Sequence, residues 1–173
     1  MSITLGADHG GQTMPADISC TEAIAPTPRI ALGADHGGYP LKEAIKTMLD
    51  KQGIAYCDFG TQGTESVDYV TFAKTVCEAV VAKECDLGIL CCGTGLGMSI
   101  AANKIRGIRA ACCADWFSAK MTREHNDANI LCLGARVTGE DAALTLADVF
   151  ISTPFSNDKR HIRRVAQISE LES

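Results

Sequence analysis

From residue 29 onward, short apolar segments alternate with longer segments that carry one apolar face, and this alternation limits the possible folds. The short segments are typical of buried strands: Arg29–Gly33, Ala55–Phe59, Leu87–Cys91, Ala110–Cys113 and Ile130–Leu133. Helical patterns cover residues 39–52, 69–83, Met98–Lys104, 116–124, Glu140–Ile151 and Asp158–Ser169. Strands that alternate with helices form a parallel sheet covered on both faces. We therefore expect one α/β domain over 29–173, a doubly wound (Rossmann-like) fold with a five-stranded parallel sheet and helices on both faces.

Residues 1–28 have a different character, with several prolines, small polar residues and no sustained periodicity. Ile3–Gly11 nearly repeats Ile30–Gly38, but only the second copy is followed by a helical pattern. We predict a disordered N-terminal extension over 1–28. A functional duplicate is the alternative, and no downstream pattern supports it.

Charge and composition exclude several classes of partner. The formal net charge is -5 and the pI is about 5.3, which argues against nucleic acid as the main partner. No apolar run is long enough to suggest a membrane span, and the N-terminus lacks the pattern of a secretory signal. We therefore expect a cytoplasmic protein. The nine cysteines include no C-x-x-C pair, so we interpret most of them as buried thiols and expect no metal site.

A glycine-rich segment follows the third strand-like segment and reads Cys92-Gly93-Thr94-Gly95-Leu96-Gly97-Met98. Alternating glycines before a helix let backbone N–H groups converge on an anion. The segment is neither a Walker A loop nor a complete dinucleotide fingerprint. Cys92 stands directly before these amides, where a thiolate could remove a proton while the amides stabilise an enediolate. An isolated cysteine is more often structural, and its position is what favours the catalytic interpretation.

Other polar residues also stand near the predicted strand ends, where ligands bind in such sheets. Asp35 and His36 precede two glycines after the first strand, although they would also suit a plain turn. His125 and Asn126 stand at a helix end, where a histidine could be a general acid–base or only a capping residue. Arg136 follows the fifth strand.

The final helical pattern carries two arginines on one face. Arg160 and Arg164 are four residues apart, so their guanidinium groups could bind a phosphate together. A solvated basic face is the alternative. A basic cluster in an acidic protein suits a small phosphorylated ligand.

Taken together, these motifs resemble the type B ribose-5-phosphate isomerases, a family that includes galactose-6-phosphate isomerase subunits and members active on allose 6-phosphate. The resemblance covers 29–173 and rests on Gly33–Gly38, Cys92–Lys104, Gly107–Ala110, His125–Asn129 and Arg160–Val165, in that order.

The resemblance implies a role for each matching residue. Cys92 matches the catalytic base, and Met98 replaces the glutamate that other branches use at the end of the loop. His125 matches the ring-opening acid–base residue. The other matches contact the enediolate, the sugar or its phosphate: Asp35, His36, Tyr69, Gly93, Thr94, Gly95, Leu96, Gly97, Asn126, Arg136, Arg160 and Arg164. Val70 replaces the proline that commonly follows the tyrosine, a departure from the family pattern next to Tyr69.

The implied activity is the reversible isomerisation of ribose 5-phosphate and ribulose 5-phosphate in the pentose phosphate pathway, without a metal or organic cofactor. Family members are dimers or tetramers of dimers, and we expect the active site to be shared, with Cys92 from one subunit and His125 from the other. Two alternatives stay open. One is an isomerase of a hexose 6-phosphate, and the other is a non-catalytic sugar-phosphate sensor on the same fold.

Overall fold

The computed structural model describes residues 19–21 and 27–172, and its centre is a mixed six-stranded sheet. The strands are β1 (Ser19–Cys20), β2 (Ile30–Ala34), β3 (Tyr56–Asp58), β4 (Leu87–Cys92), β5 (Ala110–Cys112) and β6 (Ile130–Gly134). Their order across the sheet is β1-β3-β2-β4-β6-β5. The five strands from β2 to β6 are parallel, as predicted, and β1 pairs antiparallel with β3.

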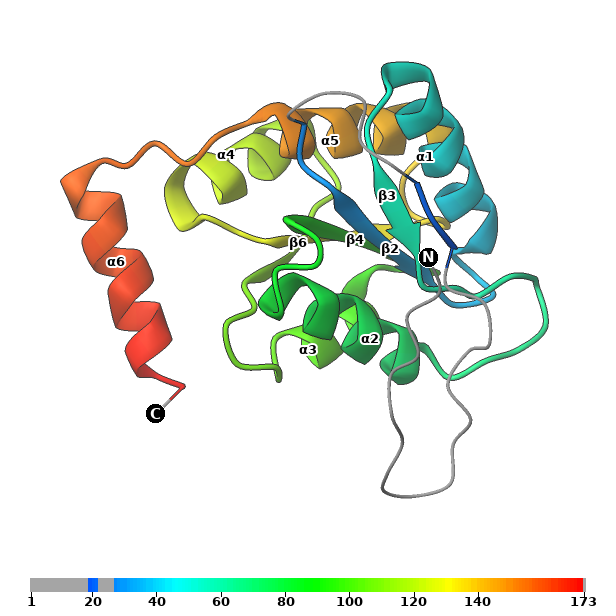
Figure 1. The fold of residues 1–173 in the computed structure, drawn as a ribbon, viewed down its shortest axis with the longest axis horizontal. Helices are drawn as coiled ribbons and strands as arrows, with labels where there is room; N and C mark the ends of the chain where they lie inside the picture. Colours follow the sequence, from blue (N-terminus) through cyan, green and yellow to red (C-terminus); the bar gives the residue numbers. More distant parts are fainter. Residues whose placement is uncertain (1–18, 22–26, 173) are drawn as a thin grey trace.

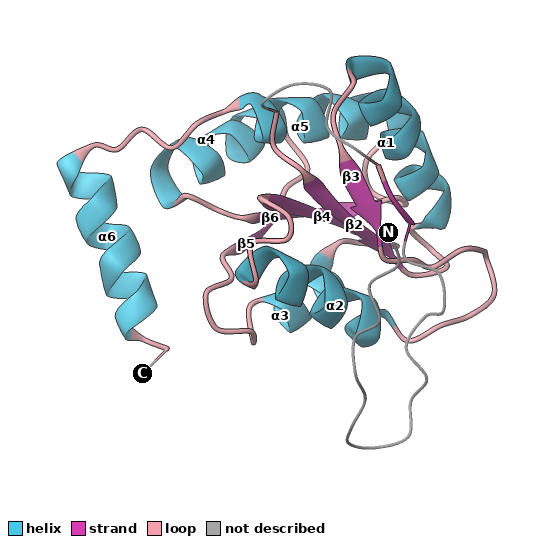
Figure 2. Cartoon of the chain, viewed as in Figure 1, coloured by secondary structure: helices cyan, strands magenta, loops and turns pink. Residues whose placement is uncertain are grey.

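Helices cover both faces of the sheet, which confirms the doubly wound architecture (Figure 1). They are α1 (Tyr39–Gln52), α2 (Tyr69–Val81), α3 (Leu96–Ala102), α4 (Trp116–Asn126), α5 (Glu140–Ser152) and α6 (Lys159–Glu170). Figure 2 shows α2 and α3 on one side of the sheet and α1, α4 and α5 on the other, with α6 standing away from the strands.

Each face of the sheet has its own hydrophobic core. Along β2, Ile30 and Leu32 pack with side chains of α1 and α5 such as Ile45 and Phe150. Ala31, between them in sequence, packs on the opposite face with Val76 of α2. This division follows from the strand period, since successive side chains point to opposite faces.

The prediction of five strands was incomplete, because β1 lies within the extension that the sequence predicted to be disordered. Ser19 and Cys20 pair with Asp58 and Cys57, the Thr21 amide donates to the Tyr56 carbonyl at 2.8 Å, and a disulfide joins Cys20 to Cys57. A strand of two residues is too short to show an alternation of apolar and polar side chains, so it is identified only by its pairing with β3. The rest of the predicted disorder and the repeat at 3–11 fall on 1–18 and 22–26, outside the described residues. The disulfide places Cys20 and Cys57 outside the buried-thiol interpretation, which was made for most of the cysteines.

The remaining seven cysteines are free, and all of them except the exposed Cys112 fit the interpretation as buried thiols. Burial raises the pKa of Cys77 to about 12 and the pKa values of Cys85 and Cys113 to about 11, so these groups stay protonated at neutral pH. They act as small apolar side chains in the core.

A buried ion pair joins the start of α1 to the end of β3. The ammonium of Lys42 lies 2.7 and 2.6 Å from the two carboxylate oxygens of Asp58, and both residues are inaccessible to solvent. Lys46 reaches the same carboxylate at 2.8 Å, and the Gly60 amide donates to it at 2.9 Å. Asp58 therefore connects α1 to the first turn of the loop that leads to Tyr69.

These partners decide the ionisation of Asp58. Burial by itself would raise its pKa, but the hydrogen bonds from Lys42, Lys46 and Gly60 outweigh burial and lower the pKa below that of an ordinary aspartate. A lowered carboxyl pKa contributes stability at a pH above the ordinary value. That contribution is lost as the pH falls through the lowered value.

Replacing Asp58 with Asn should lower the free energy of unfolding by about 3–5 kcal/mol, because Lys42 would lose its buried counter-ion and keep only the partly exposed Glu43. Urea denaturation at neutral pH measures the loss. Glu43→Gln is the matched control, since its carboxylate also contacts Lys42 but is 37% exposed and should cost at most about 1 kcal/mol. Equal losses in the two variants would contradict a dominant role for the buried pair.

Candidate active site

Three of the predicted site segments meet where β2, β4 and β6 end side by side. We call this C-terminal end of the parallel strands the carboxyl edge of the sheet, and the N-terminal end the amino edge. The Asp35 amide donates to the Cys91 carbonyl at 3.1 Å, and the Arg136 amide donates to the Gly93 carbonyl at 3.0 Å. A Cβ added to Gly37 would lie 3.3 Å from the Gly93 nitrogen and 3.6 Å from the Arg136 guanidinium. The loops after the three strands are therefore in contact, as the strand alternation predicted.

Cys92 is the last residue of β4, and its sulfur is buried against the glycine loop. The Gly95 amide donates to the Cys92 sulfur at 3.0 Å. The Leu96 amide reaches the Thr94 hydroxyl at 3.4 Å, and Thr94 itself is exposed. An N–H donor therefore faces the sulfur of the residue predicted to act as the base.

The loop is shorter than predicted, because α3 begins at Leu96 and not at Met98. Gly95 is the N-cap and has φ 78, a left-handed conformation that glycine adopts without strain. Gly97 lies in the first turn of the helix, against the ring of Tyr69, where an added Cβ would meet the ring at 3.0 Å. Tyr69 thus lies beside the loop, as its predicted role requires.

Asp35 and His36 are held by backbone donors. The Gly38 amide donates to the Asp35 carboxylate at 2.9 Å, and the Val67 amide donates to Nδ1 of His36 at 3.3 Å. Asp35 is buried, and its carboxylate lies next to Gly37, which contacts the glycine loop. These bonds fix both side chains on the carboxyl edge.

His125 and Asn126 lie at the opposite edge of the sheet. They end α4, which starts after β5 and returns to the amino ends of the strands. The Asn129 carbonyl, three residues further on, accepts from the Gly88 amide at the start of β4, at 2.9 Å. Cys92 ends that six-residue strand, whose length is about 17 Å. Within one chain, the structure therefore does not bring His125 to Cys92.

The two arginines of α6 accompany His125. The rings of His125 and His161 lie 4.3 Å apart, and His161 falls between Arg160 and Arg164 in the sequence. Both arginines are exposed, and α6 contacts α4. The predicted site is thus divided into a carboxyl-edge group around Cys92 and an amino-edge group around His125.

His161 lies beside His125 in the amino-edge group, although no role was predicted for it. It is buried, and the Ser156 hydroxyl lies 2.7 Å from its Nδ1. Desolvation and the nearby His125 and Arg160 lower the pKa of His161, which favours its neutral form. A histidine flanked by two arginines was the available signal, but its contact with His125 depends on the fold.

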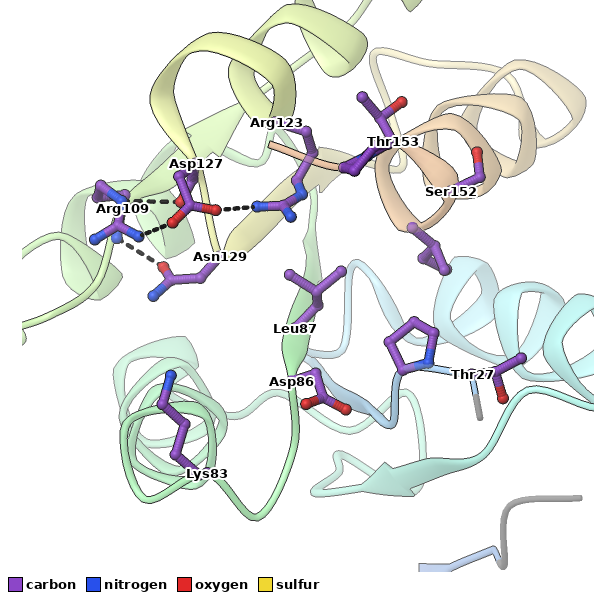
Figure 3. Close-up of a pocket in the computed structure, with 13 residues that line it drawn as sticks. Thr27, Lys83, Asp86, Leu87, Arg109, Arg123, Asp127, Asn129, Ser152 and Thr153 are labelled. Atoms are coloured by element: carbon purple, nitrogen blue, oxygen red, sulfur yellow. Dashed lines mark hydrogen bonds and ion pairs between the residues drawn. The ribbon is translucent and has the colours of Figure 1, made fainter. Parts of the chain in front are cut away.

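A cavity of about 560 Å³ also opens at the amino edge, beneath the end of α4 (Figure 3). Its lining is mostly polar and includes Lys83, Asp86, Arg109, Arg123, Asp127 and Asn129. None of the residues predicted for catalysis lines it. Among the described residues, no group of three or more His, Cys, Asp or Glu side chains could hold a metal ion. Nor does any described helix have the length and apolar character to cross a membrane.

Comparison with known proteins identifies the family. Residues 30–168 match the family model described as ribose/galactose isomerase. The chain belongs to this family. It is 43% identical over 144 residues to ribose-5-phosphate isomerase B of Escherichia coli, covering 83% of this chain and 96% of that one.

Two further proteins with names from this family are also similar to the chain. A solved ribose-5-phosphate isomerase B from Clostridium thermocellum has 55% sequence identity and a TM-score of 0.81, with 83% of this chain and 97% of that chain covered. Galactose-6-phosphate isomerase subunit LacB of Clostridium acetobutylicum is 35% identical over 131 residues, which is 76% of each chain.

Replacing Gly95 with Ala should destabilise the protein by about 1–3 kcal/mol, because a Cβ would impose strain at positive φ and overpack the loop. The added Cβ would lie 2.8 Å from the Cys112 sulfur and 3.1 Å from the Leu133 carbonyl carbon. Chemical denaturation measures the change. Gly63→Ala is the control, since its Cβ would meet no atom within 4 Å, and it should shift stability by at most about 0.5 kcal/mol. A Gly95→Ala protein as stable as this control would show that the loop relaxes freely.

Proposed function

We propose that this protein interconverts ribose 5-phosphate and ribulose 5-phosphate through an enediolate. The observation that supports this most strongly is the contact between the Cys92 sulfur and the Gly95 amide at the carboxyl edge of the sheet. It stands in a chain that is 43% identical to a ribose-5-phosphate isomerase B and 35% identical to a galactose-6-phosphate isomerase subunit. A pentose phosphate is therefore favoured over a hexose phosphate.

The proposed chemistry moves hydrogen within the sugar. Cys92, as a thiolate, removes the proton from C2 of the open-chain aldose and returns a proton to C1. The hydroxyl at C2 loses its proton as that carbon becomes the ketone, and the oxygen at C1 gains one. C1 is reduced by the same two electrons that C2 gives up, so the reaction needs no external oxidant or redox cofactor.

The glycine loop supplies electrostatic stabilisation in this scheme. Negative charge develops on the enediolate oxygens, and the Gly95 amide is an N–H donor beside Cys92 at the start of α3. Donors that are oriented before the reaction stabilise such charge without reorganisation. Tyr69 borders the same loop, and Asp35 and His36 precede Gly37, which contacts it; all three side chains would contact the sugar hydroxyls.

His125 would open the furanose ring, and the arginines would bind the phosphate. Ring opening needs a proton on the ring oxygen and removal of the proton from the C1 hydroxyl, and a histidine can perform both transfers near neutral pH. Arg160 and Arg164 lie on one face of α6 near His125, and Arg136 lies by the glycine loop. Together they would bind the phosphate in a site where the His125 group of one copy meets the Cys92 group of another.

We further propose that each active site is shared by two copies of this chain. Within one chain the two groups lie at opposite ends of β4, a strand about 17 Å long, so a single chain does not bring both to one sugar. A second copy can bring its His125 to the Cys92 of the first. Exposed apolar side chains near the carboxyl edge offer a surface for such a partner: Leu96, Ile100, Trp116 and Phe117.

Replacing Cys92 with Ser should reduce kcat for ribose 5-phosphate by about 10²- to 10⁴-fold, because a hydroxyl is a much weaker base than a thiolate. An assay that detects ribulose 5-phosphate measures the loss. Cys85→Ser, which removes a thiol at the far edge of the sheet, should keep the activity of the unmodified protein. A Cys92→Ser enzyme with more than about a tenth of the original kcat would remove this residue from the role of base. An unmodified protein without turnover would overturn the proposed function itself.

Subunit complementation tests the shared site. Cys92→Ser and His125→Asn, each inactive alone, should regain activity when co-expressed, because a mixed dimer has one site with both lesions and one with neither. Random pairing should restore about a quarter of the original activity. Native mass spectrometry establishes that mixed dimers form. Background activity in proven mixed dimers would refute the shared site and leave the isomerase assignment unaffected.

A further inference from the structure

The end of α4 is built around Asp127, an unusual residue for its position. Asp127 is the C-cap, with φ 48 and ψ 43, and directly follows His125 and Asn126. Glycine and asparagine are the usual residues in this left-handed conformation. A negative charge is also unfavourable at a helix C-terminus, where the helix dipole is negative. Capping alone therefore does not account for an aspartate here.

Two arginines hold the Asp127 carboxylate from either side (Figure 3). Arg123 reaches one oxygen through Nη1 at 2.9 Å, and Arg109 reaches the other through Nη2, also at 2.9 Å. They come from different elements, since Arg123 belongs to α4 and Arg109 precedes β5. The carboxylate thus ties the end of the helix to the sheet.

The same arginines also bind the backbone of the turn. Nε of Arg109 donates to the Asn126 carbonyl at 3.2 Å and to the Asp127 carbonyl at 2.9 Å. Nη1 of Arg123 donates to the Ala128 carbonyl at 2.7 Å. The last carbonyls of a helix have no partner within the helix, and here side chains bind them. The backbone is therefore fixed at three successive residues after His125.

The side chains of Arg109, Arg123 and Asp127 are partly buried, so solvent weakens their ion pairs less than it would on the surface. The side chains of Arg109, Arg123 and Asp127 are 20%, 12% and 34% exposed, and Arg123 also lies over the ring of Phe150 at 5.7 Å. Nε of Arg123 is buried and lacks a hydrogen-bond partner among the described residues. The Arg123 guanidinium leaves this donor unsatisfied and still binds Asp127 and Ala128. We infer that its position is determined by its bonds to the turn.

We propose that Asp127, held between Arg109 and Arg123, is a positioning residue that fixes His125 for ring opening of the sugar phosphate. It acts through the helix end and touches no substrate. The ring of His125 rests on His161 on one side, and the Asp127 turn fixes its backbone on the other. This inference rests on the ring-opening role proposed for His125.

Ring opening can be observed separately from isomerisation. In a Cys92→Ser background, isomerisation of ribose 5-phosphate is slowed by about 10²- to 10⁴-fold. Enzyme-catalysed ring opening then appears as faster exchange between the two furanose anomers of this sugar. Exchange NMR on substrate labelled with ¹³C at C1 measures that rate. With Cys92 intact, deuterium uptake at C1 of ribulose 5-phosphate reports the base alone, because this ketose has its O5 phosphorylated and cannot close a furanose ring.

Asp127→Gly is the decisive variant, because glycine tolerates the left-handed backbone and removes only the carboxylate. We expect anomer exchange to fall at least about tenfold, since a small misplacement of a catalytic group is costly. Deuterium uptake at C1 of ribulose 5-phosphate should stay within about twofold, because misplacing His125 does not alter the base. Asp115→Gly is the matched control. It removes the side-chain cap at the other end of α4, where Asp115 accepts from the Ser118 amide at 2.8 Å, and should leave both rates unchanged.

Each other outcome has a definite meaning. Unchanged anomer exchange in Asp127→Gly, with exchange abolished in His125→Asn, would overturn the positioning role. Loss of both rates in a folded Asp127→Gly protein would assign Asp127 to general structure and also overturn it. Unchanged exchange in His125→Asn would refute the proposed role of His125 itself. If Asp127→Gly does not fold, Asp127→Asn keeps a residue suited to this backbone and must show the same selective loss.

Discussion

In a parallel strand–helix unit, each strand ends at the carboxyl edge of the sheet and each returning helix ends at the amino edge. This constraint determines where the residues of the candidate site lie. Residues that follow a strand, such as Cys92, reach the carboxyl edge. Residues that end a returning helix, such as His125, reach the amino edge. No loop rearrangement of ordinary size removes a separation set by the length of β4. The division of the candidate site is thus a property of the topology.

The sequence predicted most of the architecture, because the pattern of apolar residues repeats over whole elements. The predicted helix at 39–52 has the bounds of α1, and β4 begins at Leu87 as expected. Boundaries were less accurate where one residue decides them. Gly95 starts α3 two residues early through its left-handed backbone, and α4 continues past residue 124 to the cap at Asp127.

Features that depend on pairing across the fold could not be read from the sequence. Lys42 looked like one more residue of a helix, and nothing local indicates that Asp58 would neutralise it in the core. The same holds for Asp127, whose two arginines lie eighteen residues before it and four residues before it in the chain. Side-chain chemistry was predictable from residue type and position. Which charges meet was not, because ion pairs form between elements.

The short β1 has a consequence for how copies of this chain can associate. An open sheet normally exposes the hydrogen-bonding groups of its outer strands, which can recruit another strand. Here Ser19 and Cys20 pair with the outer side of β3, and the outermost strand on the other side of the sheet is the three-residue β5. Among the described residues, neither outermost strand is long enough for a neighbour to extend. Growth of a continuous sheet between copies is therefore disfavoured, and assembly is directed to helices and loops, the elements that hold the two groups of the site.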